Sequence, residues 1–135
     1  VVIVRGTSST NTVVSILDDI SSKYNVKIVS AISWELFDRQ TADYKSSIIN
    51  SQEWADSMVI TNTGLSVMKN WISNRIVSEY SLSPDWDNRW RTGGTLEQII
   101  DEAHLSPRWV IEAISKFSED RIDRLERLKK EIPDN

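Results

Sequence analysis

Residues 1–32 decide the fold class of this chain, and they read VVIVRGTSSTNTVVSILDDISSKYNVKIVSAI. The first four residues are all β-branched, which is typical of a strand that is buried on both faces of a parallel sheet. A turn-and-cap cluster follows at residues 6–11, and apolar residues then recur at helical spacing from Val13 to Ile20. Because Val26 to Ile32 forms a second β-branched run, the sequence predicts a strand–helix–strand unit with two parallel strands.

The alternation of strands and helices continues through the rest of the chain. The next predicted elements are two short helical pieces within 34–50, a strand at 58–61, a helical face at 65–72, a strand at 76–82, a polar, tryptophan-rich loop at 83–94, and helices at 95–103 and from 107. From residue 118 onward the chain is mostly charged, but apolar residues recur at every third position, which predicts a solvated amphipathic tail helix. The pattern as a whole predicts an α/β fold with a mostly parallel sheet.

The composition is that of one ordinary soluble domain. Of the 135 residues, 39% are hydrophobic and 27% are charged, which is enough apolar content for one folded core. The formal net charge is −4 and the isoelectric point is about 5.0, so we expect neither nucleic acid nor an anionic membrane as a partner. No apolar run approaches the roughly 20 residues that span a bilayer.

The counts of cysteine and histidine exclude two further kinds of site. There is no cysteine, so the chain has neither a disulfide framework nor thiolate metal ligands. His104 is the sole histidine, which excludes the usual structural zinc sites. The absence of cysteine fits a reducing compartment, and we expect a cytoplasmic protein. Because Val1 lies directly in the first apolar run, we also expect the chain to be a piece of a longer polypeptide.

The most specific motif spans residues 26–40 and reads VKIVSAISWELFDRQ. It resembles a motif of the C-terminal domain of transketolases, in which a strand runs into Trp-Glu-Leu-Phe followed by an acid, one variable residue and glutamine. Weaker similarity to the same domain lies at residues 1–8, 44–48, 63–71 and 96–114. The resemblance therefore covers nearly the whole chain up to Phe117.

The resemblance implies a three-layer α/β/α domain at residues 1–117. Its mostly parallel sheet would have about five strands, one of them antiparallel. Residues 118–135 lie outside the family pattern and are expected to form the charged tail helix. The segment at 80–91 also departs from the pattern, because the family has a Phe-Gly pair and a small-residue loop where this chain has a larger, more aromatic loop.

The resemblance also implies a function. Transketolases transfer ketol groups between sugar phosphates, and they hold thiamine diphosphate through magnesium with a Gly-Asp-Gly signature and a distant asparagine. This chain contains no Gly-Asp-Gly sequence. The resemblance thus implies that preceding domains, or a separate catalytic subunit, bind the cofactor and the substrates. The chain would contribute to assembly and to the dimer contacts of a homodimeric enzyme. Alone it would be inactive, with no cofactor, metal or catalytic residue of its own.

Two other functions fit the sequence. The decarboxylating component of a 2-oxo acid dehydrogenase complex has a homologous C-terminal domain, which serves dimer contacts and docking on an acyltransferase core. The match at residues 34–37 favours transketolase over this enzyme. The third function, from a different class, is a regulatory module that binds a small anion at residues 7–10.

The first group of candidate site residues lies between the first strand and the first helix. The anion-binding candidate comprises Gly6, Thr7, Ser8, Ser9 and Thr10. A helix that starts directly after a strand directs backbone N–H groups toward a bound anion. The alternative interpretation is that these hydroxyl residues only cap the helix.

The second group is a candidate interface with neighbouring domains. It comprises Trp34, Glu35, Leu36 and Phe37. Large apolar residues that follow a strand so closely are typical of an interface core or of the chain's own core, and both interpretations stay open.

The loop at Trp86–Arg91 and His104 have less specific interpretations. The tryptophans and arginines of the loop would suit a phosphorylated ligand or a base. If the arginines instead pair with Asp85 and Asp87, the loop is a cover over the sheet edge. His104 is predicted to lie near the end of a helix, as a capping or surface residue.

Overall fold

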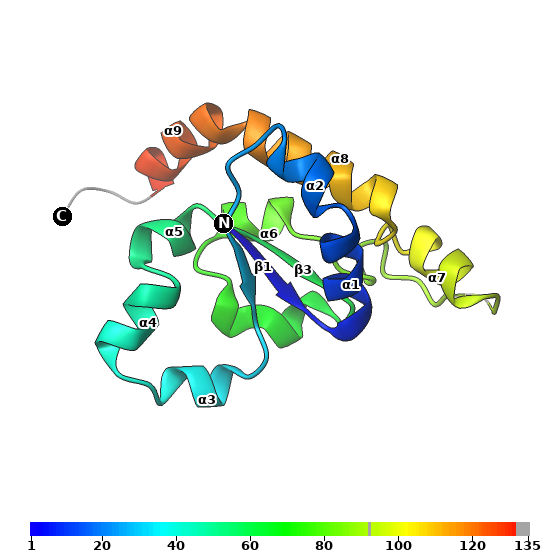
Figure 1. Cartoon of the computed structure of the whole chain (residues 1–135), viewed down its shortest axis with the longest axis horizontal. Coiled ribbons are helices and arrows are strands. Elements are labelled where there is room, and N and C mark those ends of the chain that lie inside the picture. The colour runs from blue at the N-terminus through cyan, green and yellow to red at the C-terminus, as the bar shows by residue number, and fades with distance from the viewer. Residues whose placement is uncertain (92, 132–135) are drawn as a thin grey trace.

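The structure, a computed structural model, describes residues 1–91 and 93–131. Figure 1 shows helices around a small sheet, with α3, α4 and α5 forming an arc along one side and α1, α2, α8 and α9 on the other. The elements are β1 (Val2–Arg5), α1 (Thr7–Ser15), α2 (Leu17–Ser21), β2 (Ile28–Ser30), α3 (Trp34–Asp38), α4 (Ala42–Ile48), α5 (Ser51–Ala55), β3 (Met58–Thr61), the 3₁₀ helix η1 (Leu65–Trp71), α6 (Arg75–Tyr80), α7 (Leu96–Glu102), α8 (Pro107–Glu119) and α9 (Arg121–Glu131). None of the helices in this part of the chain is long and apolar enough to cross a membrane.

The sheet is parallel, with its strands in the order β2-β1-β3. Val2 of β1 aligns with Ile28 of β2 and with Met58 of β3. The predicted α/β class, the opening strand–helix–strand unit and the strand at 58–61 are therefore confirmed. β2 is shorter than the predicted strand at 26–32, because only its three central residues pair with β1.

The strand predicted at residues 76–82 is wrong. Most of that segment is helix α6, and the side chain of Asn74 caps it by accepting a hydrogen bond from the backbone of its first turn. The first turn of α6 buries two apolar residues in succession, so the apolar pattern alone did not distinguish helix from strand. Leu82 pairs with β3 through a single parallel bridge to Ile60, and the Ser81 hydroxyl accepts a hydrogen bond from the N–H of Val59. The described residues thus contain three strands, against the five or so that were expected.

Apolar side chains cover both faces of the sheet, because successive residues of a strand point to opposite faces. On one face, Val2 and Val4 join a buried cluster with residues of α1 and α8. On the other face, Ile3 joins a second cluster that includes Trp71 of η1. The uninterrupted β-branched run at the start of the chain is explained by this burial on both faces.

Helix α9 closes the amino end of the sheet. α8 continues through Glu119 and the chain bends at Asp120, so the tail helix begins slightly later than expected. Arg124 of α9 is only 1% exposed, and its guanidinium lies 3.6 Å from the centroid of the Phe117 ring. It also pairs with Asp56 at 2.6 Å. The helix that was expected to be solvated therefore buries one side. The ion pair between Arg124 and Asp56 holds that side against the rest of the fold.

Candidate functional site

The candidate site lies at the carboxyl ends of β1 and β3. The chain leaves β1 through α1 toward β2, and it later reaches β3 on the other side of β1. In open parallel sheets, ligands bind where the strand order switches direction in this way. The anion-binding candidate at residues 6–10 starts directly after β1, and residues 62–64 follow β3 next to it.

Gly6 allows the chain to turn from β1 into α1. Its φ is 95° and its ψ is 148°, a conformation that is essentially restricted to glycine. An added Cβ atom would lie 2.1 Å from Oδ1 of Asn62, so no larger side chain fits without moving that residue. The Nδ2 atom of Asn62 donates a hydrogen bond to Oγ of Ser8 at 3.1 Å. This bond ties the segment after β3 to the first turn of α1.

The first turn of α1 has backbone N–H groups that no side chain caps. The expected turn at residues 6–11 is mostly helix, and the alternative that its hydroxyl residues cap the helix is wrong. The N–H group of Thr10 donates to the Gly6 carbonyl at 2.9 Å, and the three preceding N–H groups have no acceptor within the helix. Residues 7–9 thus have the geometry that anion binding requires, and anion binding there stays a prediction.

Side chains near this end of the sheet are mixed in charge. Arg5, the last residue of β1, places Nη1 3.8 Å from the sulfur of Met68. Asp85 accepts hydrogen bonds from the Ser83 hydroxyl at 2.6 Å and from the backbone N–H of Leu65 at 3.3 Å. The negative charge of Asp85 would repel a bound anion, so we expect this end of the sheet to attract phosphate or sulfate only weakly.

The structure divides the interface candidate into two halves. Trp34 and Phe37 are partly buried and belong to an aromatic cluster with Trp54 and Trp71, which we call the tryptophan cluster. Its ring centroids lie 5.1–6.1 Å apart, in tilted or edge-on arrangements that aromatic rings favour. Leu36, in contrast, is 62% exposed. The candidate residues therefore contribute both to the chain's own core and to its surface.

Glu35 stabilises the start of α3. The side chain of Ser33 caps this helix by accepting a hydrogen bond from the N–H of Leu36. The Glu35 carboxylate accepts from its own backbone N–H and from the Ser33 hydroxyl, and these bonds hold its pKa below the usual value. Glu35 is exposed, and its contacts are those of a helix start.

One predicted alternative for the loop at residues 86–91, arginines paired with Asp85 and Asp87, holds for Asp87 alone, because Asp85 instead accepts from Ser83 and Leu65. Arg91 binds Asp87 through two hydrogen bonds, at 2.9 and 3.0 Å, and its side chain is mostly buried. Arg89 lies 3.5 Å from the same carboxylate. Trp90 is 97% exposed, so it belongs to no core within the described residues.

His104 caps the end of α7, as was predicted: its φ is 60°, and the N–H groups of His104 and Leu105 donate to the carbonyls of Asp101 and Ile100. His104 is also partly buried. Its ring lies between two indoles, with centroids 4.2 Å from Trp86 and 3.8 Å from Trp109. The Arg91 guanidinium lies over the Trp86 ring, and that of Arg108 lies over the Trp109 ring. The stack fastens the large loop to α8. The sequence carried no signal for it, because the three rings come from a loop, a helix end and another helix.

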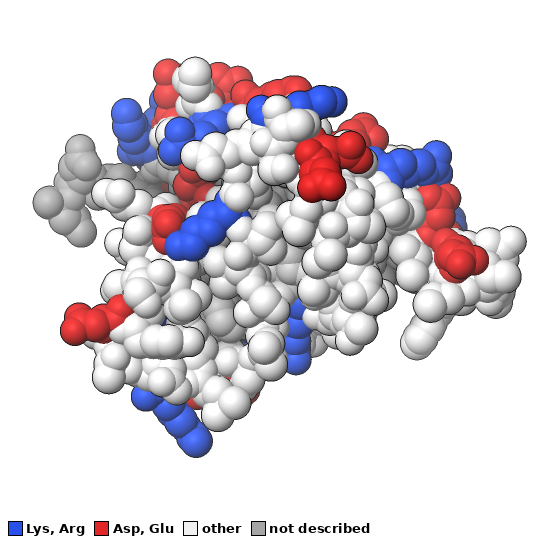
Figure 2. All heavy atoms as spheres, in the orientation of Figure 1, with Lys and Arg blue, Asp and Glu red and all other residues white. Residues whose placement is uncertain are grey.

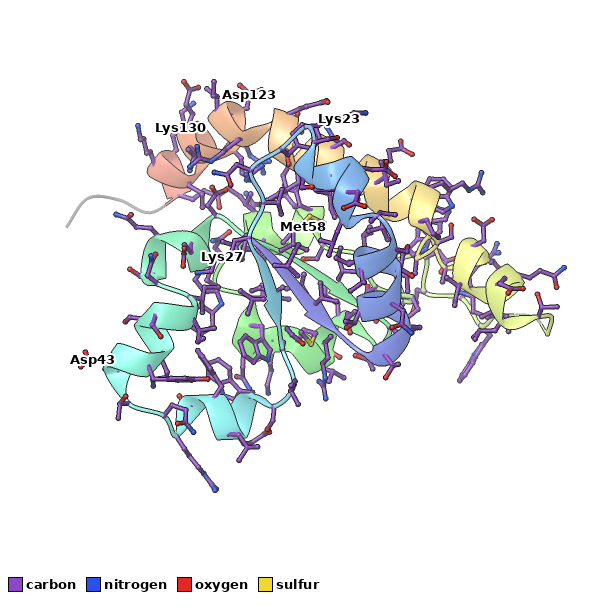
Figure 3. The ribbon with its side chains drawn as sticks, in the orientation of Figure 1. Lys23, Lys27, Asp43, Met58, Asp123 and Lys130 are labelled. Carbon is purple, nitrogen blue, oxygen red and sulfur yellow. The ribbon has the colours of Figure 1, made fainter. Side chains whose placement is uncertain are left out.

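The opposite end of the sheet has a cavity of about 1020 Å³. Its lining includes Asp56, Arg121 and Arg124, which form one ion-pair network. Burial raises the pKa of Asp56, but the hydrogen bonds from Arg124 and Arg121 together outweigh burial and hold that pKa below its usual value. Figure 3 labels Lys27, which lines this cavity just before β2, and Met58, the first residue of β3. Because its acids and bases pair with each other, the network is built to hold α9 in place.

Across residues 1–91 and 93–131, no three histidine, aspartate or glutamate side chains are grouped as a metal site would need. Comparisons with family models, curated proteins and solved structures found no match to this chain. Its function must therefore be argued from its own residues.

Proposed function

We propose that this chain is the C-terminal domain of a transketolase, and that it serves assembly and dimer contacts. The observation that carries the proposal is the position of the motif at residues 34–40. It starts at the carboxyl end of β2, sends Trp34 and Phe37 into the core and leaves Leu36 exposed. A domain that folds by itself and then packs against a catalytic partner needs this division between core and surface.

The proposal assigns the chemistry to other domains. A transketolase binds thiamine diphosphate and magnesium through a Gly-Asp-Gly signature, which this chain lacks. The complete enzyme would transfer ketol groups between sugar phosphates, and this chain would support the domains that do so. The proposal includes the family's finer architecture, a three-layer domain whose sheet has about five strands, and a location in the cytoplasm.

The test combines the chain with a catalytic polypeptide. The partner is the polypeptide from the same genome that carries Gly-Asp-Gly and a distant asparagine, whether as a separate subunit or as preceding domains. We expect the chain alone to show neither calorimetric binding of thiamine diphosphate nor ketol transfer. Addition of the catalytic polypeptide should give ketol transfer that depends on this chain.

A surface variant provides the matched control. Leu36→Asp changes an exposed residue and should leave folding intact while it weakens assembly. Leu17→Asp places the same charge on α2, away from the motif, and should leave assembly unchanged. Micromolar binding of thiamine diphosphate to the chain alone would overturn the proposal, as would decarboxylation of 2-oxo acids by the assembled protein.

A further inference from the structure

The outer edge of the sheet, along β2, has backbone groups that face away from the fold. The carbonyl of Lys27 and the N–H of Ala31 bond to β1, and Val29 lies midway between them. Bonds in a parallel ladder alternate at every second residue, so the N–H and C=O groups of Val29 also face β1. Those of Ile28 and Ser30 therefore point outward. In the described part of the chain, no strand pairs with β2 on that side.

A groove of about 650 Å³ runs beside this edge, between β2 and the helices α3 and α4. Phe37 and Trp71 contribute its aromatic, more buried part. Ile32, Leu36 and Tyr44 also line it, and their exposed fractions are 83%, 62% and 50%. Single exposed apolar residues are normal, but several of them around one groove mark an interaction site.

This side of the molecule is largely uncharged. Figure 2 shows that lysine, arginine, aspartate and glutamate lie mostly around the margin of this face. Among the residues that line the groove only Lys27 is charged, and its ammonium group already pairs with Glu53 at 2.9 Å. Solvent-exposed edge strands usually carry a charge, a proline or a bulge that prevents pairing, or are very short, and of these devices Ile28–Ser30 has only the short length. The surface thus matches an uncharged, apolar partner.

We propose that the β2 edge and this groove bind an extended segment of another polypeptide, with apolar side chains at alternate positions. The segment adds a strand to the sheet by pairing with the outward groups of Ile28 and Ser30. Because the side chains of a strand alternate between its two faces, every second one enters the groove. β2 is three residues long, so about four partner residues make the backbone contacts. The inference rests on the edge and the groove alone and does not require the transketolase assignment.

A capped pentapeptide tests the proposal, with valine at its first, third and fifth positions and threonine at the other two. It is titrated into the full chain while amide NMR spectra and hydrogen exchange are recorded. We expect shifts and about tenfold slower exchange at the outward amides of Ile28 and Ser30. The amides of Val29 and Ala31 already bond to β1 and should change little. The same peptide with N-methylated backbone amides keeps its side chains but cannot pair, and it should bind at least about tenfold more weakly.

Two variants of the chain complete the test. Ser30→Pro removes one outward N–H and no bond to β1, so it should lower peptide affinity about tenfold, whereas Ser30→Ala should not. Should Ser30→Pro fail to fold, Leu36→Asp changes the groove wall instead and should also weaken binding. Equal binding of the N-methylated peptide overturns the proposal, and so does a lack of change at Ile28 and Ser30. A concentration-dependent dimer that protects these two amides without peptide also overturns it, because the edge would then bind a second copy.

Discussion

The two ends of the parallel sheet are built differently. At the amino end, Asp56 pairs with Arg121 and Arg124, and this network holds α9 across the strands. At the carboxyl end, a glycine and one hydrogen bond between Asn62 and Ser8 hold the turn from β1 into α1. The chain therefore fixes one end with partly buried charge and leaves backbone N–H groups available at the other. Ligands of open parallel sheets bind at that second end.

The largest expected effect is at the amino end. Arg124→Ala removes the buried partner of Asp56 and the cation over Phe117, so the free energy of unfolding should fall by about 3–5 kcal/mol. Urea denaturation measures this loss in the free energy of unfolding. Arg121 binds the same carboxylate but is mostly exposed, so Arg121→Ala should cost about 1 kcal/mol or less. Similar small losses for both variants would show that α9 does not hold this end together.

At the carboxyl end, Gly6→Ala should cost about 2–3 kcal/mol, because alanine must adopt a backbone conformation that is restricted to glycine. The new Cβ would also displace the Asn62 side chain, which ends only 2.1 Å from it. Adding Asn62→Ala relieves the overlap but not the backbone strain, so the double variant should recover only part of the loss. Denaturation of both variants gives the comparison. Full recovery would mean that the conformation of Gly6 is not strained for alanine.

The interface candidate lies beside the second face of the sheet, and two variants separate its halves. Trp34→Ala opens the tryptophan cluster and should lower the free energy of unfolding by about 2 kcal/mol, because the residue is partly buried and packs against three rings. Leu36→Ala should change it by less than about 0.5 kcal/mol, because the side chain is exposed. If Trp34→Ala melts like the unchanged chain, the tryptophan belongs to an interface and not to the core.

Local patterns predicted the parts of the fold that depend on local physics. The strand at Met58–Thr61 has four successive buried residues between polar neighbours, and only a strand covered on both faces fits so short a run. Thr95 forms a capping box with Gln98, and the helix begins where the sequence placed it. For residues 76–80 the apolar pattern fitted a helix and a strand equally. The cap at Asn74 decided between them.

The contacts that set the two ends apart could not be predicted. Arg124 lies in a charged segment that looks solvated, and its partner Asp56 is 68 residues away in the sequence. The hydrogen bond from Asn62 to Ser8 likewise joins residues separated by 54 positions. A sequence pattern gives spacing within an element but not the pairing of distant polar groups. The sequence therefore predicted the position of the candidate site at residues 6–10, because it follows a strand. The contacts that hold the site in place are visible only in the folded structure.

Acid should weaken the amino end of the sheet. The folded pKa of Asp56 lies below the usual value of 3.8, so its pairs stabilise the fold above that pH and are lost as the pH falls through the folded pKa. The free energy of unfolding should therefore decrease between about pH 4 and pH 2. Asp56→Asn cannot titrate and should show a shallower decrease over this range, measured by urea denaturation at each pH. Parallel curves for the two proteins would assign the acid sensitivity to other carboxylates.

The smallest expected effect is anion binding at the carboxyl end. Phosphate at the first turn of α1 would accept hydrogen bonds from the backbone N–H groups of residues 7–9, and a helix start contributes about 0.3–1 kcal/mol to such binding. We therefore expect millimolar or weaker affinity, seen as amide shifts at Thr7, Ser8 and Ser9 during a phosphate titration at pH 7. Sodium chloride at equal ionic strength controls for screening. The cavity at the amino end is the competing site, because Lys23 and Lys129 line it together with its paired arginines. Shifts that saturate there, and not in α1, would show that the charged end binds anions and would reverse the contrast between the two ends.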